Sequence, residues 1–317
     1  MQRRPLGRSG LLAAPLALGG NVFGWTADEA TSHSVLDAFV AGGFNLIDTA
    51  NSYSRWVDGH SGGESEAVIG RWIAKRGRHD DVLIATKVGS DTGLGHKCLK
   101  REHILAEVEA SLRRLRIERI DLYQSHWDDP DTPQDETLEA YDRLVRAGKV
   151  RAIGASNLDA GRLAGALAAS RAHDLPRYET LQPHYNLVVR DAFEGPLQEL
   201  CVKEGLGVIP YYALASGFLT GKYRSPADFR KSARGPGIAK YLDARGVAVL
   251  AALDRVSSRC GATMAQVALA WLMAKPGIAA PIASATSVAQ LEELMGAARL
   301  ALDADAMRSL DAAGVSG

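Results

Sequence analysis

Residues 82–125 read VLIATKVGSDTGLGHKCLKREHILAEVEASLRRLRIERIDLYQS, in which two short apolar runs enclose a longer helical segment. The runs at 82–87 and 120–125 are too apolar for strands that keep one face in water, and such runs are typical of strands buried in a parallel sheet. Residues 101–116 between them have the apolar spacing of a helix. The stretch therefore predicts a strand, a helix and a second, parallel strand.

The same alternation extends in both directions along the chain. Asp28 is expected to cap one of the helices, which ends near Gly42. Eight strands alternating with helices favour a (β/α)8 barrel, although alternation alone also fits an open doubly wound sheet. Against the open sheet, no GxGxxG turn follows an early strand. The expected strands are LALGG (16–20), FNLID (44–48), VLIATK (82–87), IDLYQS (120–125), VRAIGAS (150–156), YETLQ (178–182), LGVIP (206–210) and IAAPIA (278–283).

Three features lie outside this repeating pattern. Residues 1–20 place basic residues before an apolar stretch that prolines and glycines interrupt, which favours an N-terminal β-hairpin over a signal peptide. Residues 215–241, after the seventh strand, form a long Gly-rich, basic loop, and long loops on a barrel are usually lids or binding loops. A final short helix is expected beyond Leu300. With no linker or repeat, residues 1–317 are expected to form one domain.

Composition narrows the class of partner. Of the 317 residues, 46% are hydrophobic, which is enough for a large core. Lys and Arg together number 37, as do Asp and Glu, so net charge provides no attraction to nucleic acid or to an anionic membrane. Three widely spaced cysteines, Cys98, Cys201 and Cys260, indicate a reducing compartment without disulfides. No apolar run is long enough to span a bilayer, so we expect a soluble cytoplasmic protein with a small-molecule partner.

Four polar residues stand at or just beyond the ends of three predicted strands. Asp48 and Tyr53 follow the second run, Lys87 the third and His126 the fourth. Because the carboxyl ends of neighbouring parallel strands meet, the four side chains are expected to converge on one pocket. Taken singly, each has an ordinary role as a cap, a core residue or a surface charge. The lysine is the most informative, because a charge directly after an apolar strand is costly unless it is paired.

These residue types form an acid–base site whose proton donor is a phenol. A free tyrosine has a pKa of about 10, and an ammonium beside it is expected to lower that pKa. Lys87 can supply the ammonium, Asp48 can hold it by an ion pair, and His126 can hydrogen-bond the substrate oxygen. Tyr53 would then protonate a carbonyl oxygen while a hydride reaches the carbon. The chain has no redox group of its own, so the hydride must come from a nicotinamide.

A metal site is the competing interpretation of the same region. His126, Asp128 and Asp129 could ligate a divalent ion, as in hydrolytic barrels. Apart from His184, no second histidine with suitable surroundings lies near a strand end. Lys87 would also place a positive charge beside the ion. We therefore predict that the site holds no metal.

The ends of the later strands carry groups that suit a nicotinamide cofactor. Ser156, Asn157 and Gln182 are neutral hydrogen-bonding groups that fit a carboxamide, although a Ser–Asn pair can also cap a loop. Tyr211 presents an aromatic face that could stack on a planar ring. Further along, exposed backbone N–H groups of a Gly-rich turn could hold a pyrophosphate. The residues of that turn are Gly217, Leu219, Gly221 and Lys222.

Tryptophans are the candidates for the substrate pocket. Trp25, Trp56 and Trp127 lie on loops above the expected barrel mouth. Aromatic residues in such loops are poor fillers of a core, which favours pocket lining over a structural role. Arg55, close to Tyr53, could meet an anionic or sugar group.

Seven segments between residues 16 and 295 resemble those of the aldo-keto reductase superfamily. The resemblance implies a barrel that binds NADPH in extended form, with the four strand-end residues as the catalytic tetrad. It also implies that Ser156, Asn157, Gln182 and Tyr211 hold the nicotinamide, and that the loop at 215–241 folds over the pyrophosphate. The segments are IDTANSYS (47–54), VLIATKVG (82–89), IDLYQSHWDDP (120–130), GKVRAIGASN (148–157), LQPHYNL (181–187), GVIPYYALASGFLTGKY (207–223) and AQVALAWL (265–272).

The segment after the eighth strand departs from the family pattern. The family often has a lysine or arginine there, which pairs with the 2′-phosphate of NADPH, whereas PIASATSVAQLEEL (281–294) has no basic residue. Ser284, Thr286 and Ser287 can still hydrogen-bond a phosphate, with Gln290 beside them, but without the strength of a charge-assisted bond. NADPH is the expected cofactor, and NADH stays possible.

The residues and the resemblance together predict NAD(P)H-dependent reduction of an aldehyde, a ketone or a keto-sugar. An NADPH-binding redox sensor or accessory subunit with little turnover is the alternative, since some proteins resembling this family are accessory subunits of ion channels. A metal-dependent hydrolase or isomerase is a third class. The complete tetrad favours the reductase, because a sensor need not keep it. Neither the carbonyl compound nor the oligomeric state can be predicted from these patterns.

Overall fold

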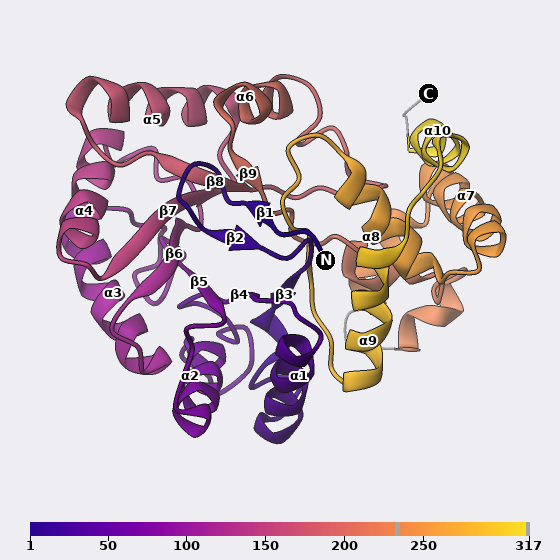
Figure 1. Ribbon diagram of the computed structural model, residues 1–317, viewed down its shortest axis with the longest axis horizontal. Helices are drawn as coiled ribbons and strands as arrows, with labels where there is room; N and C mark the ends of the chain where they lie inside the picture. Colours follow the sequence, from indigo (N-terminus) through magenta and orange to yellow (C-terminus); the bar gives the residue numbers. More distant parts are fainter. Residues whose placement is uncertain (232–234, 315–317) are drawn as a thin grey trace.

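The computed structural model describes residues 1–231 and 235–314. Within this part of the chain, the strands of the main sheet are β3 (Ala17–Gly19), β4 (Leu46–Asp48), β5 (Leu83–Val88), β6 (Ile120–Ser125), β7 (Val150–Ser156), β8 (Tyr178–Gln182), β9 (Gly207–Val208) and β10 (Ile282–Ala283). All are parallel, in the order β10-β3-β4-β5-β6-β7-β8-β9 (Figure 1). The ring closes where Val208 and Ile278 form a parallel bridge and the backbone N–H of Ile282 donates to Pro210 at 2.9 Å.

Each strand lies at one of the eight apolar runs of the sequence, so the predicted (β/α)8 barrel is confirmed. Helices follow the strands and cover the outside of the sheet (Figure 1). Asp28 caps the first helix by accepting a hydrogen bond from the backbone N–H of Thr31, and Gly42 follows its end, as predicted. The helices are α1 (Glu29–Ala41), α2 (Glu64–Arg76), α3 (Arg101–Leu115), α4 (Gln134–Arg146), α5 (Ala160–His173), α6 (Pro196–Glu204), α7 (Ala244–Cys260), α8 (Met264–Ala274), α9 (Val288–Gly296) and α10 (Ala304–Ala313).

The predicted N-terminal hairpin consists of β1 (Arg4–Pro5) and β2 (Leu12–Ala13), which pair antiparallel. It lies across the middle of the ring in Figure 1. Leu6 and Leu11 of the hairpin pack with inward-facing strand residues such as Leu46, Leu83 and Leu122. The hairpin therefore closes the amino-terminal end of the barrel with apolar side chains, and the carboxyl ends of the strands stay accessible.

The long segment after β9 is more ordered than the predicted loop. It contains short 3₁₀ helices at Ala215–Thr220, Pro226–Lys231 and Gly235–Tyr241, while residues 232–234 of the predicted loop lie outside the described residues. The helix predicted for the end of the chain is α10, which packs against α7. The segment after β9 therefore leads from the end of that strand to α7 on the outside of the barrel.

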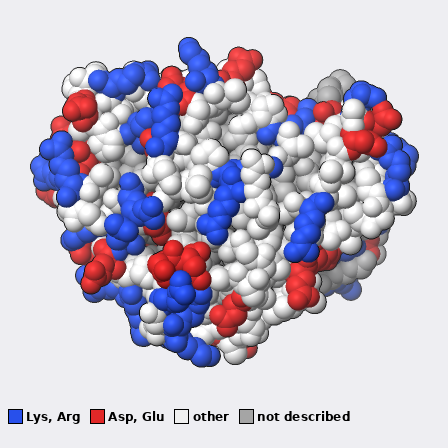
Figure 2. Space-filling model, in the orientation of Figure 1, with Lys and Arg blue, Asp and Glu red and all other residues white. Residues whose placement is uncertain are grey.

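The described residues contain no helix that is long and apolar enough to cross a membrane. Figure 2 shows lysine and arginine side chains interspersed with aspartate and glutamate on the viewed face. This mixture agrees with the equal totals of 37 basic and 37 acidic residues. Charge on this face is therefore balanced locally as well as overall.

Candidate active site

The carboxyl ends of the strands surround a cavity of about 1150 Å³. Sites for drug-sized ligands occupy about 300–1,000 Å³, so this cavity can hold a dinucleotide together with a small substrate. Most of the predicted site residues line it. They are Asp48, Tyr53, Trp56, His126, Trp127, Ser156, Asn157, Gln182, Tyr211, Gly217, Lys222, Ser284, Thr286 and Gln290.

Lys87 and part of the turn after β9 do not line the cavity. Lys87 lies fully buried beneath the cavity wall, and Leu219 is fully buried in the core. The backbone N–H groups of Gly217 and Leu219 donate to the oxygen of Leu214, and that of Gly221 donates within the same turn. The prediction that these three amides are exposed is therefore wrong, because the chain folds into a short 3₁₀ helix that uses them. Of the predicted turn, Gly217 and Lys222 reach the cavity.

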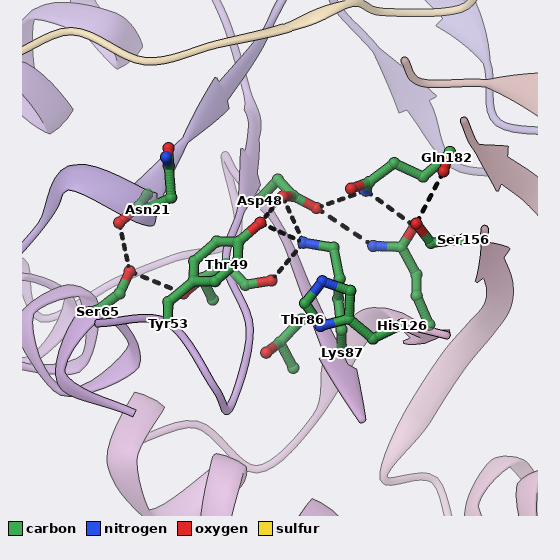
Figure 3. Close-up of polar contacts among 12 residues, drawn as sticks. Asn21, Asp48, Thr49, Tyr53, Ser65, Thr86, Lys87, His126, Ser156 and Gln182 are labelled. Carbon is green, nitrogen blue, oxygen red and sulfur yellow. Dashed lines mark hydrogen bonds and ion pairs between the residues drawn. The ribbon is translucent and has the colours of Figure 1, made fainter. Parts of the chain in front are cut away.

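Lys87, Asp48 and Tyr53 form a closed hydrogen-bonded group (Figure 3). Lys87 Nζ donates to Asp48 Oδ2 at 2.6 Å, to Tyr53 Oη at 2.9 Å and to the backbone oxygen of Thr49 at 2.8 Å. Tyr53 Oη donates to Asp48 Oδ2 at 3.3 Å. A lysine has three hydrogens to donate, and all three are used here. The ammonium is therefore fixed directly behind the phenol.

Two buried glutamines complete the surroundings of Asp48. Gln182 Nε2 donates to Asp48 Oδ1 at 2.9 Å, and Gln124 Nε2 donates to the same oxygen at 3.3 Å. With the two donors on Oδ2, the carboxylate accepts four hydrogen bonds, which is about its full capacity. The sequence did not single out Gln124, because it lies inside an apolar run and resembles any interior strand residue. Its one signal is a polar side chain on a strand expected to be buried.

Burial controls the protonation of the phenol and of the lysine. Burial raises the pKa of Tyr53 well above its ordinary value, and the charge of Asp48 raises it further. Burial lowers the pKa of Lys87, and the ion pair with Asp48 opposes that change. The expected lowering of the Tyr53 pKa by Lys87 is therefore not the net result, because Asp48 offsets the ammonium and burial disfavours the phenolate. The phenol keeps its proton at neutral pH.

His126 faces Tyr53, with 6.0 Å between the ring centroids. Its Nδ1 lies 2.8 Å from Ser90 Oγ, a cavity residue that the sequence did not single out. Burial lowers the pKa of His126 well below its ordinary value, and the charges of Lys87 and Lys97 lower it further. The imidazole is therefore neutral at neutral pH, with one ring nitrogen as a donor and the other as an acceptor.

Asn157 and Tyr211 form a connected polar wall. Tyr211 Oη donates to Asn157 Oδ1 at 2.8 Å, and Asn157 Nδ2 donates to the backbone oxygen of His126 at 2.8 Å and to Ser156 Oγ at 3.1 Å. His184 stacks against Tyr211, with ring centroids 5.2 Å apart and planes 23° apart. The aromatic face predicted at Tyr211 is thus held in place by hydrogen bonding and by a second ring.

The other end of the cavity lies at the N-terminus of α9. Ser287 caps this helix by accepting from the backbone N–H of Gln290. Gln290 Oε1 accepts from both the backbone N–H and the hydroxyl of Thr286. Glu293 also lines this part of the cavity, in a segment without basic residues. This end therefore presents hydroxyls, an amide and a helix N-terminus, which favours an anion, next to one carboxylate.

Aromatic rings surround the mouth of the cavity near Tyr53. Trp56 is 52% exposed, and its ring centroid lies 6.0 Å from that of Tyr53. Trp127 stacks on His126, with centroids 6.0 Å apart. Trp25 does not line the cavity but packs edge-on against Trp56 at 5.6 Å, so its predicted place in the wall is corrected to a supporting one.

The charged residues considered as a substrate contact or as metal ligands form hydrogen bonds and ion pairs within the protein. Arg55 lines the cavity and donates to the backbone oxygen of Asp91 at 2.8 Å. Asp128 forms an ion pair with Arg162 at 2.8 Å. Asp129 accepts hydrogen bonds from the backbone N–H groups of Leu99 and Asp131 and from the hydroxyl of Thr132. In the part of the chain that the structure describes, no three His, Cys, Asp or Glu side chains come together as metal ligands would.

Comparison with known proteins gives consistent matches over the chain. The model of the Aldo/keto reductase family matches residues 15–314. The chain is 36% identical to the "Uncharacterized oxidoreductase YrpG" of Bacillus subtilis, over 98% of this chain and 95% of that protein. It is 34% identical to the "Aldo-keto reductase YhdN" of the same organism, over 88% of this chain and 81% of that protein.

A third relative has a name of a different kind. The "Probable voltage-gated potassium channel subunit beta" of Arabidopsis thaliana is 32% identical, over 94% of this chain and 91% of that protein. The family model nevertheless spans nearly the whole chain, including every strand of the barrel. The chain belongs to the aldo/keto reductase family and is an oxidoreductase that acts on carbonyl compounds with a nicotinamide cofactor.

Proposed function

We propose that the protein reduces an aldehyde, a ketone or a keto-sugar to the alcohol with NAD(P)H, and that Tyr53 is the proton donor. The observation that carries this proposal is the position of the Tyr53 hydroxyl. It belongs to a residue of the cavity wall and contacts Lys87 Nζ at 2.9 Å and Asp48 Oδ2 at 3.3 Å. The acid is therefore accessible to a substrate and is held by a buried ion pair.

The proton moves from Tyr53 Oη to the substrate oxygen. A nicotinamide held in this cavity would supply the hydride for the carbonyl carbon, and the carbonyl oxygen would then develop negative charge. The raised pKa of Tyr53 keeps the proton on the phenol until that charge appears. Lys87 stabilises the phenolate that remains, and Asp48 fixes the lysine through the contact at 2.6 Å.

His126 orients the carbonyl oxygen in this proposal. When the hydroxyl of Ser90 donates to Nδ1, the neutral imidazole carries its hydrogen on Nε2. Nε2–H is then available to a substrate oxygen placed beside Tyr53, since both rings line the cavity with their centroids 6.0 Å apart. The histidine acts as a hydrogen-bond donor and not as the acid, because its lowered pKa leaves it neutral.

The cavity suits the extended cofactor at both ends. Gln182, Ser156 and Asn157 would bind the carboxamide, and the supported ring of Tyr211 would stack on the nicotinamide. At the other end, Lys222 would contact the phosphates, and the α9 N-terminus with Ser284, Thr286 and Gln290 would contact the adenosine half.

NADPH and NADH are expected to bind with similar affinity, because no cation lies in residues 281–294. Replacing Gln290 with arginine should tighten NADPH relative to NADH by about tenfold, since an arginine there can pair with the 2′-phosphate. Dissociation constants measured for both cofactors test this, with Gln290→Met as the uncharged control. An unchanged ratio would place the 2′-phosphate elsewhere, for example at Lys222.

The aromatic mouth favours substrates with an apolar or aromatic group beside the carbonyl. Replacing Trp56 with alanine should raise the KM for an aromatic ketone by about tenfold and change kcat little, because the ring contributes binding but no chemistry. Trp56→Phe, which keeps an aromatic face, should show a much smaller change in steady-state assays. A fall in kcat with an unaltered KM would contradict this role.

A redox sensor or accessory subunit is the second candidate function. It is favoured by one observation, the likeness to a protein named as a potassium channel subunit. The complete and fully hydrogen-bonded tetrad favours the reductase. We also propose a cytoplasmic location, which the free Cys98, Cys201 and Cys260 support.

The deciding experiment follows cofactor oxidation by the purified protein. NADPH and NADH are supplied separately with a panel of aldehydes, ketones and keto-sugars. Turnover that depends on the carbonyl compound supports the reductase. Tight cofactor binding without turnover on any member of the panel would favour the sensor.

A further inference from the structure

Gln124 is a buried amide that the proposed chemistry leaves without a role. It lies on β6, in register with Lys87 on β5 and with Gly154 on β7, and it is fully buried. A Cβ on Gly154 would lie 3.1 Å from Gln124 Cγ, so the glycine leaves room for the glutamine side chain. From this position it contacts both Asp48 and Gln182.

The orientation of both amides follows from Asp48. A carboxylate that is paired with Lys87 only accepts hydrogen bonds, so each glutamine must turn its Nε2 toward Asp48 Oδ1. Gln124 Oε1 then accepts the second hydrogen of Gln182 Nε2, at 3.3 Å. Both amide hydrogens of Gln182 are used, and its one remaining polar side-chain atom is the acceptor Oε1.

We propose that Gln124 is a positioning residue that fixes the amide of Gln182 so that it presents only an acceptor to the cofactor. The inference rests on the proposed function, in which Gln182 binds the nicotinamide carboxamide. The –NH₂ group of a carboxamide donates and therefore fits Gln182 Oε1. Without Gln124, one Gln182 hydrogen loses its partner, and the amide, then held only by its hydrogen bond to Asp48, can pivot about that bond and move Oε1 away from the carboxamide –NH₂.

Equilibrium binding without turnover tests this role. Three ligands are compared. The first is NADP⁺ or NAD⁺, whichever of the two wild type binds more tightly. The others are the 3-acetylpyridine analogue of that cofactor and ADP-ribose. The analogue has a methyl ketone in place of the carboxamide and cannot donate, and ADP-ribose has no nicotinamide. Wild type should bind the analogue about tenfold more weakly than the cofactor, since one hydrogen bond is lost and an acceptor is left unpaired.

Gln124→Met keeps the length of the side chain and removes its polar atoms. In this variant the preference should disappear, so that the dissociation constants of the cofactor and the analogue become about equal. The affinity for ADP-ribose should not change, because that ligand does not reach Gln182. Leu122→Met is the matched control: Leu122 is buried on the same strand, has no polar contact, and its replacement should leave the preference as in wild type.

Each outcome has one meaning. A wild-type preference that persists in Gln124→Met, or a parallel loss of ADP-ribose affinity, overturns the positioning role and leaves the proposed function standing. A wild-type protein that binds neither NADPH nor NADH overturns the proposed function, and this inference with it.

A second variant keeps the test decisive if Gln124→Met does not fold. In Gln124→Glu the introduced carboxyl group, when protonated, can donate to Asp48 and accept from Gln182 as the amide does. When ionised it cannot donate to Asp48 and is repelled by that carboxylate, which draws it away from Gln182 Nε2 as well. The preference should therefore match wild type at acid pH and fall as the pH rises, and a preference independent of pH would overturn the role.

Discussion

Replacing Tyr53 with phenylalanine should lower kcat for carbonyl reduction by about 10²- to 10⁴-fold, the range that a general acid contributes. The variant removes one oxygen and keeps the ring that faces His126. Lys87 and Asp48 remain paired with each other at 2.6 Å, so no buried charge loses its main partner. Steady-state oxidation of the cofactor with the best carbonyl substrate measures the effect.

Cofactor binding provides the control for this variant. The dissociation constant of NADPH should stay within about threefold of wild type, because in the proposed mechanism the lost hydroxyl contacts the substrate and not the cofactor carboxamide. Thermal unfolding should be close to that of wild type. A variant that keeps near-full turnover would remove Tyr53 from the role of acid and would point to His126 or a water molecule instead.

Replacing Lys87 with methionine should abolish most activity and also destabilise the fold. Asp48, 1% exposed, would become a buried charge without its counter-ion, which costs about 3–5 kcal/mol in free energy of unfolding. The phenolate of Tyr53 would lose the ammonium at 2.9 Å, so its pKa should rise further. Chemical denaturation and pH–rate profiles in both reaction directions measure the two effects.

The direction of the pH effect follows from which form of Tyr53 reacts. In the proposed mechanism, reduction needs the phenol and should be lost as pH rises through its pKa, whereas alcohol oxidation needs the phenolate and should be gained over the same pH range. Because burial already raises the pKa of Tyr53, both transitions lie at alkaline pH in wild type. In Lys87→Met both should shift to higher pH, with oxidation near neutrality losing the most.

Two control variants separate the effect of Lys87→Met on stability from its effect on catalysis. Lys75→Met, at an exposed position of α2, should change neither property. Adding Asp48→Asn to Lys87→Met removes the unpaired charge and should recover much of the stability, but not the turnover. An unchanged pH profile in Lys87→Met would contradict its role in stabilising the phenolate.

The barrel could be predicted from the sequence because each strand is local. A strand such as β5 or β6 is buried on both faces and therefore appears as a short apolar run, and eight such runs alternate with helical segments. Parallel strands place their carboxyl ends at one edge, so the meeting of Asp48, Tyr53 and His126 in one cavity wall follows from their positions after those runs.

The details of the candidate site depend on contacts that no local pattern contains. Asp48 and Gln182 are 134 positions apart, and only closure of the barrel brings them to 2.9 Å. Gln124 differs from its neighbours in the sequence only as a polar residue on a strand expected to be buried, yet it joins the two. Likewise, Leu219 belongs to the family-like turn but faces the core, because the chain there forms a short 3₁₀ helix.

The sequence by itself determined the fold class, the edge of the sheet at which the site lies and the residue types available there, since these depend on periodicity and on the position of each residue along its strand. The tertiary structure decided which atoms face one another and how they are charged. The pKa of Tyr53 shows the difference. A lysine nearby suggested a lowered value, whereas complete burial and the contact with Asp48 raise it. Burial is a property of the packed barrel, and the free energy of charging a group depends on all that surrounds it.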